Sequence, residues 1–151
     1  MNLVSQVIEP ENLSSEFIDL VLRLGQTVSR IRKLNETPHG PRFAILVSPV
    51  NPYNIKFFHS KDTDFAFTIN SLIEELILQE GWMFAVNPCA HIKSDVQGFE
   101  IEIWVPGFAT IAKHRLISYY SAQNAIKTKA CALLQAYFAA VETHKKTGVI
   151  G

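Results

Sequence analysis

Hydrophobic and polar residues alternate most regularly in the segment 99–105, which reads Phe-Glu-Ile-Glu-Ile-Trp-Val. Every second side chain is apolar and falls on one side of an extended chain, while the two glutamates and the tryptophan fall on the other side. This pattern is typical of a strand that packs on a core with one face and meets solvent with the other. We therefore expect 99–105 to lie in a sheet that is covered by helices on its inner face.

Shorter apolar segments predict the neighbouring strands. Segments 82–90 and 108–114 flank 99–105 at short distance, and the three together predict an antiparallel three-stranded meander. Two earlier segments, 43–47 and 53–59, are also rich in β-branched and aromatic residues and favour strands.

Three further segments carry apolar residues at helical spacing, namely 14–35, 62–79 and 121–146. The second begins beside Asp62, a good N-cap, and stops before Gly81, while the third is rich in alanine. The predicted fold class is α+β, with a core of helix, three strands and helix and an N-terminal helical extension. In this fold an antiparallel sheet with a three-stranded meander is sandwiched or covered by helices.

The segment 14–35 has apolar residues at alternating steps of four and three, which make a seam two heptads long. Two heptads are too short to predict a free-standing coiled coil. Packing within the domain is the first interpretation, and a contact between two copies of the chain is the second. The residues of this homo-oligomer contact would be Val21, Leu24, Val28 and Ile31.

Prolines and a glycine interrupt the chain between the first helix and the later elements, which places a boundary near Pro52. We expect an N-terminal helix and strand extension over 1–54 and an αβ sandwich core over 55–151. At 151 residues, the two parts are expected to form one compact unit.

The composition excludes several classes of protein. Apolar residues make up 48% of the chain, so global disorder is excluded, and 14 basic residues balance 14 acidic ones. Because the balanced charges create no overall field that attracts nucleic acid, we do not expect nucleic acid as a partner of the chain as a whole. The N-terminus lacks the pattern of a signal peptide and no segment has the length of a membrane helix, so we expect a cytoplasmic protein that does not bind membranes.

Two groups of residues have the chemistry of a reactive site. Cys89 and His91 fall on the same face of a strand, but no third residue is placed to orient them. His59, Asp62 and Asp64 surround the start of a helix, where capping already accounts for both aspartates. We therefore predict no catalytic residues, no metal site and no cofactor, and a protein that is not an enzyme.

The polar side of the segment 99–105 is the first candidate for a protein-binding surface. Glu100 and Glu102 are expected on an exposed sheet face, whereas Trp104 beside them is not. A large aromatic residue on a polar face indicates either cover from another element or a contact surface.

The order helix, three strands, helix resembles that of double-stranded RNA-binding domains, which makes a nucleic-acid-binding module the alternative function. The adjacent lysines that open the last helix of that family are missing here, and the loop after residue 91 is longer than the family pattern. The residues that would make this contact are His91, Lys113, Arg115, Lys127 and Lys129.

A second set of motifs follows in order between residues 55 and 140. It comprises a lead-in with serine and aspartate, a hydrophobic-acidic helix centre, a glycine-aromatic helix end, a strand with tryptophan, and an alanine-rich closing helix. The residues are Phe58-His59-Ser60-Lys61-Asp62, Ala66, Leu72-Ile73-Glu74, Gly81-Trp82, Phe99-Glu100-Ile101-Glu102-Ile103-Trp104, Asn124-Ala125-Ile126 and 130–134. This order resembles the phage ABA sandwich domain of small phage and prophage proteins.

The resemblance implies a small viral accessory protein in the cytoplasm of a bacterial host cell, and it supplies no catalytic residues. We expect a non-enzymatic protein of regulatory or anti-defence type that binds a host protein, a viral protein or a second copy of itself. Residues 1–54 are outside the resemblance.

Overall fold

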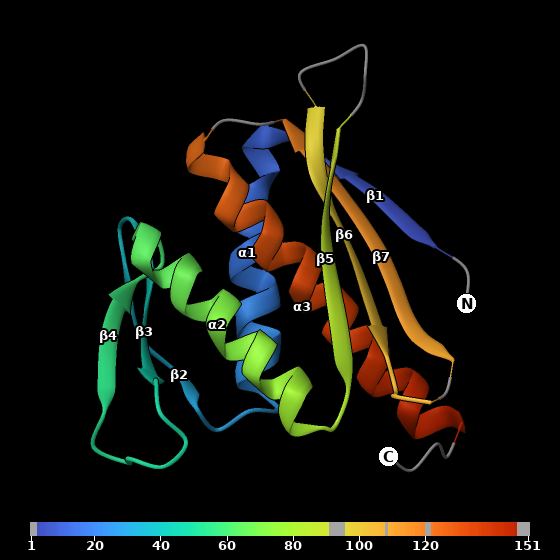
Figure 1. Ribbon diagram of the computed structural model, residues 1–151. Helices are drawn as coiled ribbons and strands as arrows, with labels where there is room; N and C mark the ends of the chain where they lie inside the picture. The colour runs from blue at the N-terminus through green and yellow to red at the C-terminus, as the bar shows by residue number, and fades with distance from the viewer. Residues whose placement is uncertain (1–2, 91–95, 108, 120–121, 148–151) are drawn as a thin grey trace.

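The computed structural model describes residues 3–90, 96–107, 109–119 and 122–147, which contain three helices and seven strands (Figure 1). The predicted mixed α+β class is therefore confirmed. The elements in chain order are β1 (Val4–Ile8), α1 (Pro10–Gly25), β2 (Ile31–Thr37), β3 (Gly40–Leu46), β4 (Ile55–His59), α2 (Thr63–Gln79), β5 (Met83–Ala90), β6 (Val96–Trp104), β7 (Thr110–Tyr119) and α3 (Ala122–Thr147).

The larger sheet has four strands in the order β1-β7-β6-β5. Strands β5, β6 and β7 pair antiparallel, and β1 pairs parallel with β7 at the edge. This fourth strand was not predicted, so the three-stranded arrangement is not the complete sheet. The alternation in β6 has the expected result, because Ile101 and Ile103 are completely buried on the inner face.

The smaller sheet has the order β2-β3-β4, and all its pairs are antiparallel. Its first turn requires a glycine for two reasons. Gly40 has a φ of 114°, in the region that favours glycine, and a Cβ atom there would lie 2.6 Å from Ser60 Oγ. The turn therefore brings β2 and β3 against the chain that follows β4.

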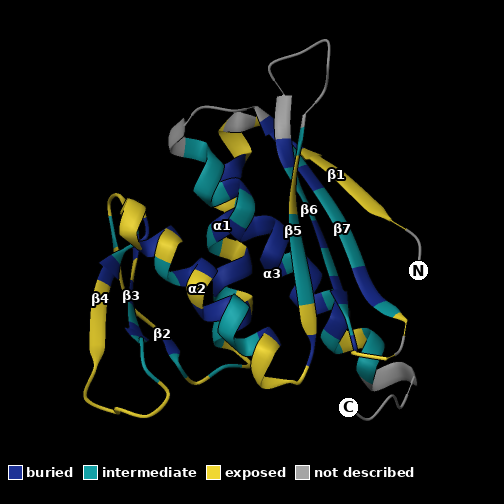
Figure 2. Ribbon diagram, in the orientation of Figure 1, coloured by how far each residue is buried: buried dark blue, intermediate teal, exposed yellow. Residues whose placement is uncertain are grey.

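The three helices lie between the two sheets (Figure 1). Helix α3 packs on β6 and β7, α1 and α2 pack on α3, and the smaller sheet contacts α1 through β2 and α2 through β4. Consecutive residues of α3 are buried, as expected of a helix enclosed on all sides (Figure 2). The sequence predicts that helices cover the inner face of this sheet, and α3 does so, whereas α2 contacts mainly α3 and meets the larger sheet at β5. In the described residues, no helix covers the outer face of this sheet.

The first helix is shorter than the predicted segment 14–35. Helix α1 starts at Pro10, which suits its first turn, and ends at Gly25, after which the Thr27 hydroxyl donates to the Leu24 carbonyl at 3.1 Å. Ile31 continues the helical spacing by coincidence, since it is buried as the first residue of β2.

Elements on both sides of the boundary predicted near Pro52 contribute to one hydrophobic cluster. Its aromatic centre is Phe65 of α2, whose ring lies 5.0 Å from Phe43 of β3, 5.6 Å from Phe17 of α1 and 5.8 Å from Phe58 of β4. This cluster joins the smaller sheet to the helices. Among the described residues, no helix has the length and apolarity needed to span a membrane.

Candidate binding surfaces

The predicted protein-binding residues Glu100, Glu102 and Trp104 lie together on the outer face of the larger sheet. Glu100 forms ion pairs with Arg115 at 2.9 Å and with Lys113 at 3.7 Å, both across the strand pair from it. Glu102 accepts a hydrogen bond from Thr110 at 2.6 Å. The charges of this face are therefore largely matched within the sheet, which leaves few groups that need an external partner.

Trp104 on the same face is partly buried, and its cross-strand neighbour Met83 is 44% exposed. The two side chains make a small apolar area at one end of the sheet. This area remains a predicted contact surface.

The residues of the nucleic-acid alternative do not lie on one side of the molecule. Lys113 and Arg115 are on the outer face of the larger sheet and are paired with Glu100, whereas α3 packs against the inner face. On α3, Lys129 pairs with Glu74 at 3.4 Å. His91 lies outside the described residues.

Lys127 of α3 donates a hydrogen bond to Ser14 Oγ at 3.1 Å. Burial lowers the pKa of Lys127, and the nearby Lys61 acts in the same direction. This lysine is therefore already engaged within the chain, and the predicted cations do not form a continuous basic surface.

The residues predicted to join two copies of the chain are used inside it. Val21 and Leu24 are completely buried and Ile31 is 4% exposed, all within the hydrophobic cluster, and Val28 packs partly buried against it. In the structure these residues pack within the chain, which is the first of the two interpretations of the seam. A contact between two copies through them stays a prediction, and it would have to displace this packing.

The two reactive groups considered in the sequence have structural explanations. Burial raises the pKa of the Cys89 thiol, which is the opposite of what an activated nucleophile needs. His59 Nδ1 accepts from the Lys61 backbone N–H at 3.2 Å and Nε2 lies 2.9 Å from Thr37 Oγ1. Asp62 accepts from the His59 backbone N–H at 2.9 Å. Within the described ranges, no three His, Cys, Asp or Glu side chains are placed to hold a metal ion.

A surface that we did not predict lies on the outer face of the smaller sheet. Burial alternates along β3, so that Phe43 and Ile45 point inward and the residues between them point outward. The register pairs these outward positions with Arg32 on β2 and with Ile55 and Phe57 on β4. We call this surface the small-sheet patch, and it consists of Arg32, Arg42, Ala44, Leu46, Ile55 and Phe57.

The apolar side chains of the patch are open to solvent. Phe57 is 63% exposed and Ile55 is 47% exposed, and β4 is exposed along most of its length (Figure 2). Arg32 and Arg42 are exposed as well, and neither has an ion-pair partner among the described residues. The alternation along β3 is visible in the sequence. Which of its two faces meets solvent, however, depends on the side of the sheet that the helices cover.

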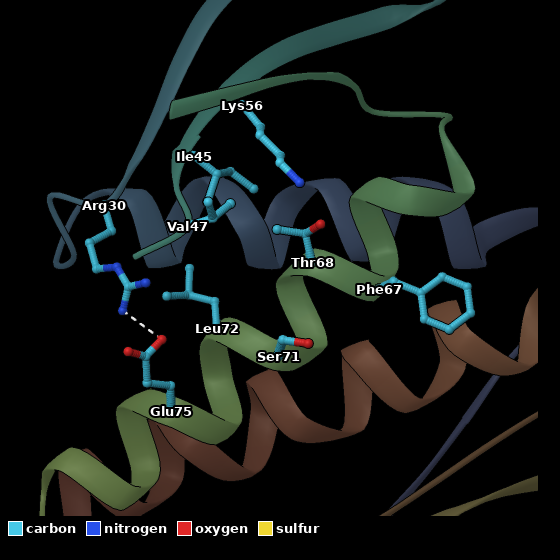
Figure 3. A pocket seen from close by; sticks show the side chains of 9 residues that line it. All are labelled: Arg30, Ile45, Val47, Lys56, Phe67, Thr68, Ser71, Leu72 and Glu75. Atoms are coloured by element: carbon cyan, nitrogen blue, oxygen red, sulfur yellow. Dashed lines mark hydrogen bonds and ion pairs between the residues drawn. The ribbon is translucent and has the colours of Figure 1, made fainter. Parts of the chain in front are cut away.

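On the inner side of the same sheet, a cavity of about 260 Å³ lies between the sheet and α2 (Figure 3). The Arg30 guanidinium closes one end by an ion pair of 2.9 Å with Glu75, and its Nε donates to the Leu46 carbonyl at 3.0 Å. Lys56 enters the cavity from β4, and its ammonium group reaches toward Thr68 (Figure 3). The cavity therefore combines charged groups at its rim with the apolar side chains that line it.

No family model, no curated protein and no solved structure matches this chain. The resemblance to the phage ABA sandwich domain stays a prediction. The exposed patch and the cavity are the two features of the described residues that packing within the chain does not account for.

Proposed function

We propose that this protein is a non-enzymatic binding protein and that it binds an acidic protein partner through the small-sheet patch. The observation that carries the proposal is the exposure of Phe57 and Ile55 on a sheet face that has two unpaired arginines. In the described residues, no helix or strand lies over this face.

The patch has the composition of a protein interface. Aromatic residues and arginine are enriched where proteins bind each other, and the strongest contacts are apolar anchors surrounded by polar groups. Complete burial of a Phe or Ile side chain stabilises by about 1.5–3 kcal/mol. Phe57 is the natural anchor, because its side chain lies in a row with Ala44 and Arg32 across the three strands.

The charge of the patch selects the partner. Arg32 and Arg42 have no acidic partner among the described residues. On the larger sheet, by contrast, Glu100 is paired with Lys113 and Arg115, and Glu102 accepts a hydrogen bond from Thr110. A partner with carboxylates around an apolar centre would form charge-assisted hydrogen bonds with both arginines.

The patch is less suited to nucleic acid. Single-stranded nucleic acid binds to several stacking aromatic residues along a basic groove, but Phe57 is the one aromatic residue of the patch. Two arginines are also too few for a strong contact with the phosphate backbone. The nucleic-acid function therefore remains the alternative.

The resemblance to the phage domain adds a proposal about the partner. A viral accessory protein in a bacterial cell would bind a host or viral protein, in a regulatory or anti-defence role. Support for this origin comes from the sequence motifs alone. The layer arrangement, in which the helices of this chain lie between the two sheets, does not add to it (Figure 1).

The test compares three forms of the chain in a pull-down from a bacterial lysate, with the captured proteins identified. The patch variant is Ile55→Ser with Phe57→Ser. The control variant is Val7→Ser with Leu78→Ser, which removes apolar side chains of similar exposure, 60% and 53%, outside the patch. Exposed positions of this kind change the free energy of unfolding by less than about 0.5 kcal/mol, which a urea titration verifies for each variant.

We expect an acidic protein that the wild type and the control variant capture, that the patch variant loses, and whose complex weakens with rising salt. Capture that persists in the patch variant contradicts the proposal. Sedimentation of the wild type addresses self-association, because a dimer that only the patch variant abolishes would make a second copy the partner. A gel shift with single-stranded DNA that depends on Phe57 would replace the protein partner by nucleic acid.

A further inference from the structure

The cavity and the small-sheet patch lie on opposite faces of one strand. In β4, Ile55 and Phe57 point outward, while Lys56 between them lines the cavity on the inner face (Figure 3). An inference about the cavity therefore does not depend on the function proposed for the patch.

Apolar side chains form much of the cavity wall. Ile45 and Leu72 are 0% and 3% exposed, and Val47 packs partly buried beside them. An apolar cavity of roughly 150 Å³ is enough to bind benzene. The present cavity, of about 260 Å³ and open to solvent on one side, is large enough for a ring of that size with a short chain attached.

The charged groups of the cavity differ in how firmly they are held. Arg30 and Glu75 are fixed against each other at 2.9 Å, and their side chains are 11% and 30% exposed. Lys56 has no ion-pair partner among the described residues, although its backbone position on the sheet directs it inward. The three charges sum to one positive charge, which favours a ligand with a single negative charge.

We propose that this cavity binds a small organic acid, with its apolar part on Ile45 and Leu72 and its carboxylate on the Lys56 ammonium group. Ser71 also lines the cavity, one turn along α2 from Thr68. The Thr68 hydroxyl already donates to the Asp64 carbonyl at 2.8 Å, so it offers an acceptor to Lys56 instead.

A different explanation of Lys56 exists and is testable. β4 is an edge strand, and an inward-pointing lysine on an edge strand prevents pairing with another chain. In that case Lys56 would protect the protein from aggregation and would have no effect on ligand affinity.

The test uses 3-phenylpropionate as the probe and its neutral analogue 3-phenylpropanamide as the control ligand, with affinities measured by NMR titration of the full chain. Four variants separate the contributions. Lys56→Gln removes the charge, Lys56→Arg keeps it, Ser71→Leu fills the rim, and Lys61→Gln removes an exposed lysine that does not line this cavity.

We expect 3-phenylpropionate to bind with a Kd of about 1 mM or lower and the amide to bind at least about tenfold more weakly. Lys56→Gln and Ser71→Leu should each weaken the acid about tenfold, while Lys56→Arg and Lys61→Gln stay within about threefold of the wild type. The proposal is overturned if the acid does not bind at about 10 mM, if the amide binds equally well, or if Lys56→Gln leaves the affinity unchanged.

Discussion

Replacing Phe65 tests whether the smaller sheet is part of the same cooperative unit as the helices. Phe65 is completely buried on α2, and its ring contacts Phe43 of β3, Phe58 of β4 and Phe17 of α1 at centroid distances of 5.0, 5.8 and 5.6 Å. Truncation of a buried Phe to Ala costs about 3–5 kcal/mol through lost burial and the cavity left behind. With three aromatic neighbours, we expect Phe65→Ala to cost about 4 kcal/mol, the middle of that range.

Urea unfolding followed by circular dichroism and by tryptophan fluorescence measures this loss. With a slope of about 2 kcal/mol per molar urea, the midpoint should fall by about 2 M, and the melting temperature by about 8–16 °C. Phe67→Ala is the matched control, since Phe67 lies two residues further along α2 and is 50% exposed, and its loss should stay within about 0.5 kcal/mol. A loss below about 1.5 kcal/mol for Phe65→Ala would refute the reasoning. So would two separate transitions in which the larger sheet keeps the wild-type midpoint.

Three further predictions concern buried polar and titratable groups. Thr128 already donates to a carbonyl of its own helix, so Ser118 is the donor in their hydrogen bond of 2.7 Å. Urea titration should therefore show a loss of about 1–3 kcal/mol for Thr128→Val, which leaves the Ser118 donor unpaired, and a smaller loss for Ser118→Ala. Burial raises the pKa of both cysteine thiols, and Cys131 is completely enclosed. Ellman's reagent should modify Cys89 slowly in the folded protein and both thiols in urea, and Cys89→Ser should abolish the reaction of the folded form. Burial also lowers the pKa of His114 from 6.5, so the unfolded chain binds this proton more readily and stability should fall as the pH decreases below about 6.5. Replacing His114 with Asn should reduce that slope in melting curves recorded between about pH 7.5 and 5.

The elements with a regular local pattern were predicted well. The alternation in 99–105 and the helical spacing in 62–79 and 121–146 come within a few residues of β6, α2 and α3. In these segments periodicity, burial and chain direction agree, so local information is sufficient. The inward burial of Ile101 and Ile103 follows directly from it.

Long-range pairing explains most of what the sequence did not predict. β1 is short, and it becomes a strand because its residues pair with β7 more than a hundred positions later, as in Val4 with His114. The true end of α1 was hidden because Val28 and Ile31 happen to continue its spacing, although Gly25 marks the place where the helix stops. The position of the helices between two sheets depends on which elements meet, and no local pattern specifies it.

The two candidate sites were missed for a related reason. Ile55, Lys56 and Phe57 are adjacent in the sequence, and until the side of the sheet that α2 covers is known, Lys56 is simply a charged residue between two apolar ones. The predicted surface at Glu100, Glu102 and Trp104 was easier to find because its strand has the clearest alternation, yet its carboxylates are engaged within the sheet. Regular alternation therefore predicts which face of a strand is exposed. It does not show whether the charged side chains on that face are already paired within the sheet.

The arrangement of β4 gives the two proposals a physical connection. Phe57 and Lys56 are neighbours on an edge strand, so a protein on the outer face and an organic acid in the cavity would both hold the same short segment of backbone. A shift of that segment caused by one ligand would change the affinity for the other. Linkage requires the effect to be reciprocal, so the factor by which the acid strengthens partner binding must equal the factor by which the partner strengthens acid binding. Lys56→Gln would remove the effect of the acid while Phe57 remains in place to bind the partner. A patch and a cavity on opposite sides of one strand can therefore act as a ligand-responsive binding surface without any movement of the larger sheet.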